Sequence, residues 1–397
     1  MSEDLRREKL REPISKKELE RRWRTVREAM AKEGLDCLIM QSRNRYLGGY
    51  VRYFSDIPAQ HSYPVSVIFP LDDEITMISH GAPPPSPASP PEWTVHGVKK
   101  RITLPYLPSL NFTKTMEAKA VADAIKSYKV KRVGIVSKAT ISASVYEYLM
   151  ENLSEVDMWD ATDMVDEIKA VKSEEEIRLV KKTAELQDKV FAAILASVRP
   201  GVREYELRAE IQRLCINLGS EQQLIMIGSA PAGTPARQLF EFYQNRTLKN
   251  GDSVCIMIEV NGPGGFYGEI GRTVCIGEAP RALLDTWANA VVAQDKTAEI
   301  MKPGAKPEEL INTHNKLLAS MGYPLEGRLL SHGQGYDLVE RPGICPGEKM
   351  TIKAGMNIVI HPTLITKESY AFCCDNYLIT DSGAVRIHKT PREVFIV

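Results

Sequence analysis

The clearest pattern of apolar and polar positions lies between Asn250 and Gly277. Residues 254–260 form an apolar run rich in β-branched side chains, which is typical of a strand. A Gly-Pro-Gly-Gly segment at 262–265 interrupts the run, and the pattern resumes over residues 266–276. This stretch is therefore predicted to form an antiparallel hairpin.

The rest of the pattern predicts alternating strands and helices first, and longer amphipathic helices later. Ser173 followed by Glu176 is a capping box that starts one of these helices, and six prolines within 83–91 predict a surface loop. The predicted helices span residues 15–33, 116–128, 173–197, 204–217, 281–301 and 307–321, and the predicted strands span 36–40, 63–69, 74–79, 132–137, 356–361 and 374–380.

Two glutamates interrupt the hairpin strands at positions where apolar side chains are expected. Glu259 and Glu269 lie on either side of the turn, so antiparallel pairing would bring them together. Burying unpaired carboxylates costs several kcal/mol, so the pair predicts a partner such as a metal, a substrate cation or a shared proton. The alternative is that one or both side chains face solvent, which periodicity does not settle.

Length and composition place the chain among ordinary globular proteins with two domains, expected over residues 1–165 and 166–397. Lys plus Arg and Asp plus Glu both number 51, which argues against a nucleic-acid partner. No apolar run is long enough to span a membrane, and the charged N-terminus does not look like a signal sequence. Seven cysteines without a CxxC pair are expected to be reduced, in a cytoplasmic protein.

Six segments in order carry a resemblance to a known family. They are IKAVKSEEEI (168–177), KNGDSVCIMIEVNG (249–262), GEIGRTVCIG (268–277), SHGQGYDLVERP (331–342), IKAGMNIVIHPTL (352–364) and DNYLITDSG (375–383). With these segments the chain resembles the creatinase/aminopeptidase P family over nearly its full length. The resemblance implies an α+β architecture, in which a pita-bread catalytic domain follows a smaller α/β domain that packs across a homodimer.

Peptidases of this family hold two divalent metals with two Asp, one His and two Glu, and this chain departs from that set. The family's second Asp falls on Glu269, its HGxG histidine on His332 and its two Glu on His361 and Cys374. Its first Asp falls on Met257 or Glu259, depending on the register of the hairpin.

These replacements alter the expected metal chemistry. Two bridged divalent cations need about four nearby carboxylates for charge balance, and this chain offers two or three. We therefore expect a pocket without a cofactor, like that of creatinase. The alternative is one divalent ion (Zn, Fe or Mn) held by Glu259, Glu269, His332 and His361.

The candidate catalytic residues are the same four side chains. His332 and His361 are expected to transfer protons, because imidazole exchanges a proton near neutral pH. Glu259 and Glu269 would hold a cationic or N–H part of the substrate, or raise each other's pKa so that one acts as an acid. Candidate substrate contacts are His61, Tyr63, Arg237, Phe240, Tyr336, Glu340 and Asp375.

These expectations lead to a hydrolase that cleaves a C–N bond in a small amidine, cyclic amide or amino-acid derivative. Two other enzymes are alternatives: a mononuclear Xaa-Pro aminopeptidase and a lyase that resembles the pita-bread enzyme acting on dimethylsulfoniopropionate. A non-catalytic pita-bread binding module is a third alternative. The Glu and His cluster disfavours it, and so does the lack of the acidic tails or basic stretches that partners of such modules require.

Overall fold

A computed structural model describes residues 7, 8, 10–81, 96–105 and 114–397, and it divides the chain into two units, Met1–Lys169 and Ala170–Val397. The two units are considered separately below. The predicted loop at 83–91 lies outside the described residues.

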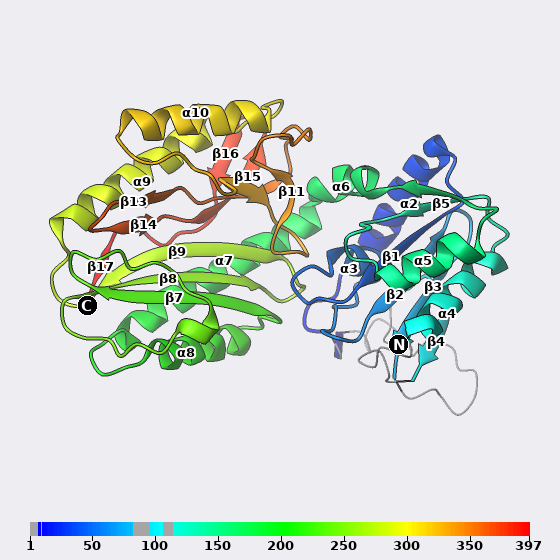
Figure 1. Ribbon diagram of the computed structural model, residues 1–397, viewed down its shortest axis with the longest axis horizontal. Helices are drawn as coiled ribbons and strands as arrows, with labels where there is room; N and C mark the ends of the chain where they lie inside the picture. The colour runs from blue at the N-terminus through cyan, green and yellow to red at the C-terminus, as the bar shows by residue number, and fades with distance from the viewer. Residues whose placement is uncertain (1–6, 9, 82–95, 106–113) are drawn as a thin grey trace. The chain divides into compact units, whose positions relative to one another are not determined.

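The first unit is built on a six-stranded mixed sheet with the strand order β4-β3-β2-β1-β5-β6 (Figure 1). Strand β1 pairs antiparallel with β2 and parallel with β5. The strands are β1 (Cys37–Ser42), β2 (Val65–Pro70), β3 (Ile75–His80), β4 (Val98–Leu104), β5 (Arg132–Ile135) and β6 (Asp157–Asp160). The helices are α2 (Lys16–Glu33), α3 (Gly49–Ser55), α4 (Lys114–Ser127), α5 (Ala143–Asn152) and α6 (Thr162–Ala170).

Helix α2 shows how local sequence sets these elements. The hydroxyl of Ser15 accepts a hydrogen bond from the Glu18 N–H at 3.1 Å and caps the helix start. Gly34 ends the helix in the left-handed region with φ +66°, which glycine adopts without steric cost. Leu19, Val26 and Met30 are fully buried along one face of α2.

The second unit contains two larger sheets flanked by two pairs of helices, and a two-stranded sheet of β13 and β14. The first sheet has the order β17-β9-β8-β7, and the second has the order β11-β10-β12-β15-β16. In Figure 1, α7 and α8 lie along one side of β7, β8 and β9, while α9 and α10 lie on the side of the second sheet. The bounds are α7 (Glu174–Ile194), η2 (Leu195–Ser197), α8 (Glu204–Asn217), β7 (Gln223–Pro231), η3 (Glu241–Tyr243), β8 (Asp252–Asn261), β9 (Tyr267–Cys275), α9 (Arg281–Ile300), α10 (Pro307–Ser320), β10 (Ser331–Gly333), β11 (Glu340–Gly343), β12 (Asn357–Ile360), β13 (Thr363–Ile365), β14 (Tyr370–Phe372), β15 (Asp375–Thr380), β16 (Gly383–Arg386) and β17 (Phe395–Ile396).

Strand β8 is buried on both faces. Because successive side chains alternate, one face packs into an apolar core and the other face carries Glu259. Val254, Ile256 and Ile258 pack into the apolar cluster that contains residues of α7 and α8. Met257, on the opposite face, packs in a separate cluster with residues of β14. Glu259 shares the face of Met257, so it points away from the α7–α8 core.

The two sheets meet where Gly271 of β9 exchanges two backbone hydrogen bonds with Cys374, at 3.2 and 3.3 Å. A side chain at position 271 would not fit, because a Cβ atom there would lie 2.4 Å from the Phe372 ring. Glycine therefore permits the close approach of β9 to the segment that joins β14 and β15.

The structure confirms the predicted fold class, a smaller α/β domain followed by a mixed catalytic domain. The predicted capping box of Ser173 and Glu176 is present, and the predicted hairpin is β8 and β9. Strand β7, which pairs along the whole of β8, was missed. Among the described helices, none is long and apolar enough to cross a membrane.

Candidate active site

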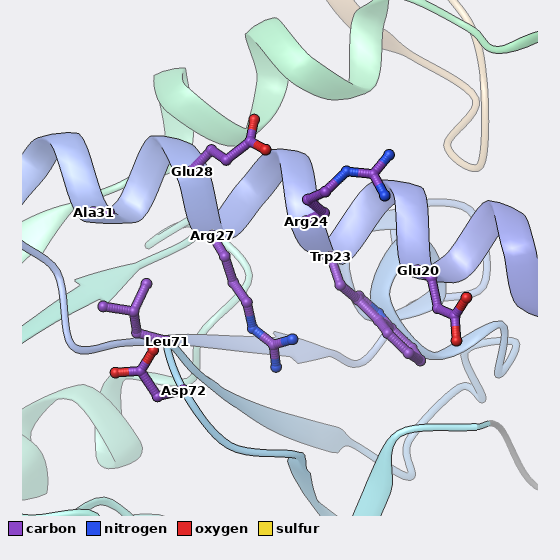
Figure 2. A pocket seen from close by; sticks show the side chains of 8 residues that line it. All are labelled: Glu20, Trp23, Arg24, Arg27, Glu28, Ala31, Leu71 and Asp72. Atoms are coloured by element: carbon purple, nitrogen blue, oxygen red, sulfur yellow. The ribbon is translucent and has the colours of Figure 1, made fainter.

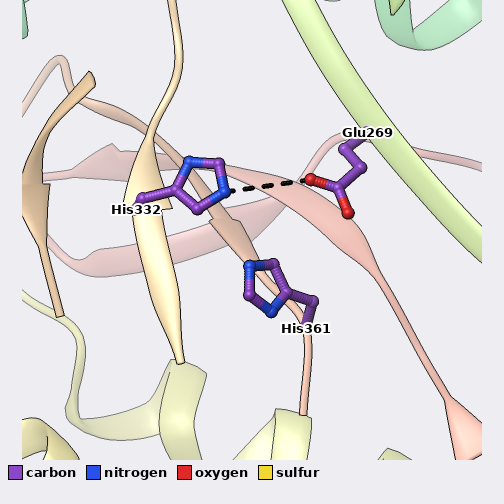
Figure 3. Close-up of side chains that lie close together, drawn as sticks. All are labelled: Glu269, His332 and His361. Carbon is purple, nitrogen blue, oxygen red and sulfur yellow. Dashed lines mark ion pairs between the residues drawn. The ribbon is translucent and has the colours of Figure 1, made fainter. Parts of the chain in front are cut away.

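Three predicted site residues converge in the second unit. The Oε2 atom of Glu269 lies 3.9 Å from Nε2 of His332, and the ring centroids of His332 and His361 are 5.3 Å apart. One ligand-type atom from each of the three residues lies within 4.8 Å of the others. All three side chains are buried, and Figure 3 shows them pointing toward one another.

The strand order of the two sheets produces this convergence. His332 lies in the middle of β10, opposite Val359 of β12, and His361 directly follows β12. The two histidines therefore come from neighbouring antiparallel strands. Glu269 comes from β9 of the other sheet, which packs against them.

Hydrogen bonding determines which nitrogen of His332 can act as a ligand. Its Nδ1 lies 2.9 Å from the Gly333 carbonyl oxygen, which can only accept, so Nδ1 carries the hydrogen. The lone pair is then on Nε2, the atom that faces Glu269. A backbone carbonyl that fixes the tautomer in this way is typical of metal-binding histidines.

His361 has a buried ring nitrogen without a partner. Its Nδ1 makes no hydrogen bond with any described residue, and its ring stacks on Phe372 with a centroid distance of 5.8 Å. An unpartnered buried nitrogen costs free energy unless a ligand satisfies it. The ring nitrogen of His361 that faces His332 and Glu269 in Figure 3 is a second candidate donor for a bound ion.

Glu259 lies beside the three residues and is not one of the converging group. It is directly opposite Glu269 in the β8–β9 register, so the predicted pairing of the two glutamates is confirmed. Its Oε1 accepts a hydrogen bond from Nε2 of Gln334 at 2.9 Å. The hairpin register also places Met257 opposite Gly271, in an apolar cluster with Phe372 and Cys374.

Burial dominates the electrostatics of the site. Burial, and after it the neighbouring Glu269, raises the pKa of Glu259 well above the usual carboxyl range, and burial raises the pKa of Glu269 to about 7. Burial lowers the pKa of His332 to about 4, and burial together with His332 lowers the pKa of His361 well below its usual value. Both imidazoles are therefore neutral at pH 7, which is the form that binds metals.

Glu269 and His332 are spaced to share one divalent cation, and a ring nitrogen of His361 lies beside them. Donor atoms bound to zinc lie about 2.0–2.2 Å from the ion, so two of them are at most about 4.4 Å apart. The 3.9 Å between Glu269 and His332 satisfies this limit. Two histidines and one carboxylate are the ligands of many catalytic Zn and non-haem Fe sites, which leave a position open for substrate.

Comparison with known proteins identifies the family. A family model described as metallopeptidase family M24 matches residues 178–390, and a model of the creatinase/prolidase N-terminal domain matches residues 22–171. The chain belongs to metallopeptidase family M24. The predicted resemblance and the prediction of a hydrolase acting on C–N bonds are thereby confirmed.

The relatives of this M24 protein have low sequence identity to it, but the matches cover long stretches of both chains. The Xaa-Pro dipeptidase of Pyrococcus furiosus is 27% identical over 263 residues, which is 65% of this chain and 74% of the relative. The ectoine hydrolase of Halomonas elongata is 21% identical over 269 residues, or 64% of this chain and 67% of the relative. The crystal structure of dipeptidase PepE from Mycobacterium ulcerans superimposes with a TM-score of 0.77 at 21% identity, covering 97% of this chain and 99% of that one.

The prediction that the M24 protein has no cofactor is wrong. Its catalytic half matches a metallopeptidase model, and Glu269, His332 and His361 converge with ligand-type atoms. The alternative stated from the sequence, one ion held by Glu259, Glu269, His332 and His361, includes the three residues that converge.

Two other predicted residues, Tyr336 and Glu340, shape the loop that follows His332. Glu340 pairs with the buried Lys172 at 2.8 Å and accepts a hydrogen bond from the Tyr336 N–H at 2.9 Å. A Cβ atom on Gly335 would lie 2.5 Å from the Glu340 carboxylate, so only glycine fits this turn. Tyr336 is buried against Phe266. Their predicted contact with substrate stays a prediction.

Asp375 is not one of the three converging residues, and its carboxylate contacts other residues of the protein. Its Oδ1 accepts a hydrogen bond from Arg272 at 2.7 Å and lies 3.2 Å from Arg386, and its Oδ2 accepts one from Gln294. Both Arg272 and Asp375 are fully buried. The structure therefore gives Asp375 a partner inside the protein and offers no support for its predicted contact with substrate.

Arg237 and Phe240 are exposed on the segment before η3. Between them, Gln238 accepts a hydrogen bond from the Tyr370 hydroxyl at 2.6 Å, and Tyr370 belongs to the cluster that contains Phe372. Because Phe372 stacks on His361, this segment is connected to the rim of the candidate site. Their role as substrate contacts stays a prediction.

His61 and Tyr63 belong to the first unit. Nδ1 of His61 accepts a hydrogen bond from the Arg45 N–H at 3.3 Å, and the His61 ring meets Tyr46 edge-on. Tyr63 is exposed. The predicted role of both residues at the catalytic site stays a prediction.

A groove of about 440 Å³ lies on the first unit, between α2 and the turn after β2 (Figure 2). Arg27 spans it from α2, and its guanidinium donates to the Pro70 and Asp73 carbonyl oxygens. The groove is lined by Glu20, Trp23, Arg24, Arg27, Glu28, Ala31, Leu71 and Asp72. The lining residues include three carboxylates but no histidine or cysteine, unlike the converging group of the second unit.

Gln334 and Asn376 are functional candidates that sequence reasoning missed. Gln334 is fully buried and bonds to Glu259, and Asn376 accepts a hydrogen bond from the Glu269 N–H at 2.7 Å. One signal was available: Gln334 lies only two residues after His332, directly after the end of β10.

Proposed function

We propose that this M24 protein is a mononuclear metal-dependent hydrolase that cleaves the C–N bond of a small amino-acid derivative, such as a dipeptide ending in proline, or of a cyclic amide or amidine. The observation that carries the proposal is the convergence of Glu269, His332 and His361. Relatives named Xaa-Pro dipeptidase and ectoine hydrolase support both kinds of substrate.

Glu269, His332 and His361 would hold the cation, the two histidines through ring nitrogens that no described residue occupies. When bound, a divalent cation there supplies Lewis-acid polarisation of the scissile group. This assignment uses the histidine lone pairs for binding, so the proton transfer expected of His332 and His361 passes to another group.

Glu259 is that group in our proposal. It lies opposite Glu269 and outside the converging set, and its Oε1 is held by Gln334. Its Oε2 receives no hydrogen bond from a residue that the structure describes. This oxygen can hold a substrate N–H group or pass a proton to the leaving nitrogen, as a general acid must.

The apolar cluster beside His361 would accept the apolar part of such a substrate. It contains Met257, Val359, Tyr370 and Phe372, and all four are buried. The family resemblance puts Cys374 at the position of an acidic ligand, and Met257 or Glu259 at the position of another. Burial followed by Glu269 raises the pKa of the Cys374 thiol well above its usual value. These side chains support a site for one ion.

Turnover measurements test the proposal. The purified chain would be stripped with a chelator, reloaded with Mn²⁺, Zn²⁺ or Fe²⁺, and assayed with Ala-Pro, ectoine and creatine. We expect hydrolysis of at least one substrate only after reloading, lost in His332→Ala and kept in Glu368→Gln, which alters an exposed carboxylate. Hydrolysis that is indifferent to the metal, or that survives His332→Ala, would overturn the proposal.

A cytoplasmic homodimer remains part of the proposed function. It rests on the family resemblance and on the cysteine pattern, and sedimentation of the purified chain would test the dimer directly. A mass equal to one chain at micromolar concentration would rule out the dimer.

A further inference from the structure

The side chain of Gln334 connects the two glutamates of the hairpin through a continuous chain of hydrogen bonds. Its Nε2 donates to Glu259 Oε1 at 2.9 Å, and its Oε1 accepts from Asn376 Nδ2 at 2.8 Å. Asn376 Oδ1 in turn accepts from the Glu269 N–H at 2.7 Å. The path therefore runs from the Glu269 backbone to the Glu259 carboxyl through two amide side chains.

The direction of this chain is fixed at one end. A backbone N–H can only donate, so the atom of Asn376 that meets Glu269 must be the oxygen. The Asn376 amino group then points the other way and donates to Gln334 and to Asn357 Oδ1 at 3.1 Å. Gln334 must consequently accept with its oxygen, and its amino group is left facing Glu259.

The backbone of Gln334 is held as firmly as its side chain. Its N–H donates to the Asn357 carbonyl at 3.0 Å, and its carbonyl accepts from Asn357 Nδ2 at 3.2 Å. Gln334 is fully buried. A buried amide whose oxygen, nitrogen and backbone groups all make hydrogen bonds has little freedom to reorient, because each broken bond costs free energy.

We infer that Gln334 is a positioning residue, which holds the Glu259 carboxyl in the candidate site by its Oε1 atom and leaves Oε2 for the substrate. This inference rests on the proposed function, in which Glu259 acts on the substrate nitrogen. His332 in β10 then faces Glu269, and Gln334, which directly follows β10, faces Glu259.

Gln334→Leu tests this role by removing the donor to Glu259 while leaving the Asn376 bond to the Glu269 N–H in place. We expect kcat to fall about 10–100-fold with the metal content unchanged, as for other residues that orient a site. Gln244→Leu is the matched control, because it removes a buried amide that bonds only to backbone carbonyls. We expect the control to lower thermal stability without changing kcat.

A double-mutant cycle separates positioning from a general structural effect. If Gln334 acts through Glu259, adding Gln334→Leu to Glu259→Gln should lower kcat by less than about twofold further. Losses that multiply in the double variant would overturn the inference, because they would show that Gln334 acts independently of Glu259.

Crystal structures of the metal-loaded wild type and of Gln334→Leu give a readout that does not need turnover. The inference predicts that the Glu259 carboxyl leaves its position opposite Glu269 in the variant. An unmoved carboxyl would overturn the inference. Failure of the wild type to hydrolyse Ala-Pro, ectoine and creatine would instead count against the proposed function, and the structures would still decide the role of Gln334.

Discussion

Nε2 of His332 faces Oε2 of Glu269 across 3.9 Å, and no hydrogen atom is available on that nitrogen to join them. A buried lone pair that faces a buried carboxyl group at this distance suits a positive partner between them. His361 brings a further ring nitrogen to the same place. A divalent cation satisfies all three groups, and this is the physical basis of the account.

Glu259 is expected to be needed for turnover and dispensable for metal binding. Glu259→Gln preserves the size of the side chain and removes its capacity to carry a transferable proton. We expect kcat to fall by about 10²–10⁴-fold, the range for loss of a general acid or base. Elemental analysis of the same variant should match the wild type. Loss of the ion together with activity would show that Glu259 is a ligand instead.

Asp375 is expected to support the fold through Arg272 and to leave substrate affinity unchanged. Asp375→Asn leaves a buried guanidinium without its anion, which typically lowers the free energy of unfolding by about 3–5 kcal/mol. Urea unfolding measures this loss, with Asp381→Asn as an exposed control. A stable Asp375→Asn variant with a raised KM would restore Asp375 as a substrate contact.

Gly271 is expected to tolerate no side chain. In Gly271→Ala the new Cβ would lie 2.4 Å from Phe372, the ring that stacks on His361. We expect the free energy of unfolding to fall by about 1–3 kcal/mol, together with a loss of activity as His361 shifts. Gly327→Ala is the matched control, because nothing lies within 4 Å of its Cβ position. Equal stabilities of the two variants would contradict the packing argument.

The contacts of the Glu348 carboxylate predict that the folded protein loses stability at acid pH. Burial alone would raise its pKa, but hydrogen bonds from Arg341 and from backbone N–H groups outweigh burial and hold the pKa at about 2. The folded-state pKa is therefore below the unfolded value of 4.5, so the stabilisation is complete above pH 4.5 and is lost as the pH falls toward 2.

Unfolding of the wild type and of Glu348→Gln between pH 7 and pH 2 measures this contribution. The stability difference between the two proteins should be constant above about pH 5 and should shrink steadily below it. A difference that stays the same down to pH 2 would show that the Glu348 carboxylate is not stabilised by these contacts.

Features set by neighbouring residues were predictable from sequence. The capping box of Ser173 and Glu176 depends on a single helical turn, and the pairing of Glu259 with Glu269 depends on one hairpin. The convergence of His332 and His361 was accessible only through the family motifs, since the two residues come from separate strands.

Features that depend on distant segments were not predictable. The partner of Glu259 is Gln334, and the partner of Asp375 is Arg272; both contacts require knowing how the two sheets pack. Strand β7 was missed because Gly228, Ser229 and Pro231 weaken its apolar pattern, while its long pairing with β8 compensates. The prediction of a pocket without a cofactor was wrong because the sequence does not show how closely Glu269, His332 and His361 converge.

Elemental analysis of untagged protein purified without chelators tests the central claim most directly. The account predicts about one divalent ion per chain in the wild type and in Glu368→Gln, and much less than one in Glu269→Ala, His332→Ala and His361→Ala. A wild type that holds no stoichiometric metal after incubation with Mn²⁺ or Zn²⁺ would contradict it. So would three alanine variants that retain the ion as fully as the wild type.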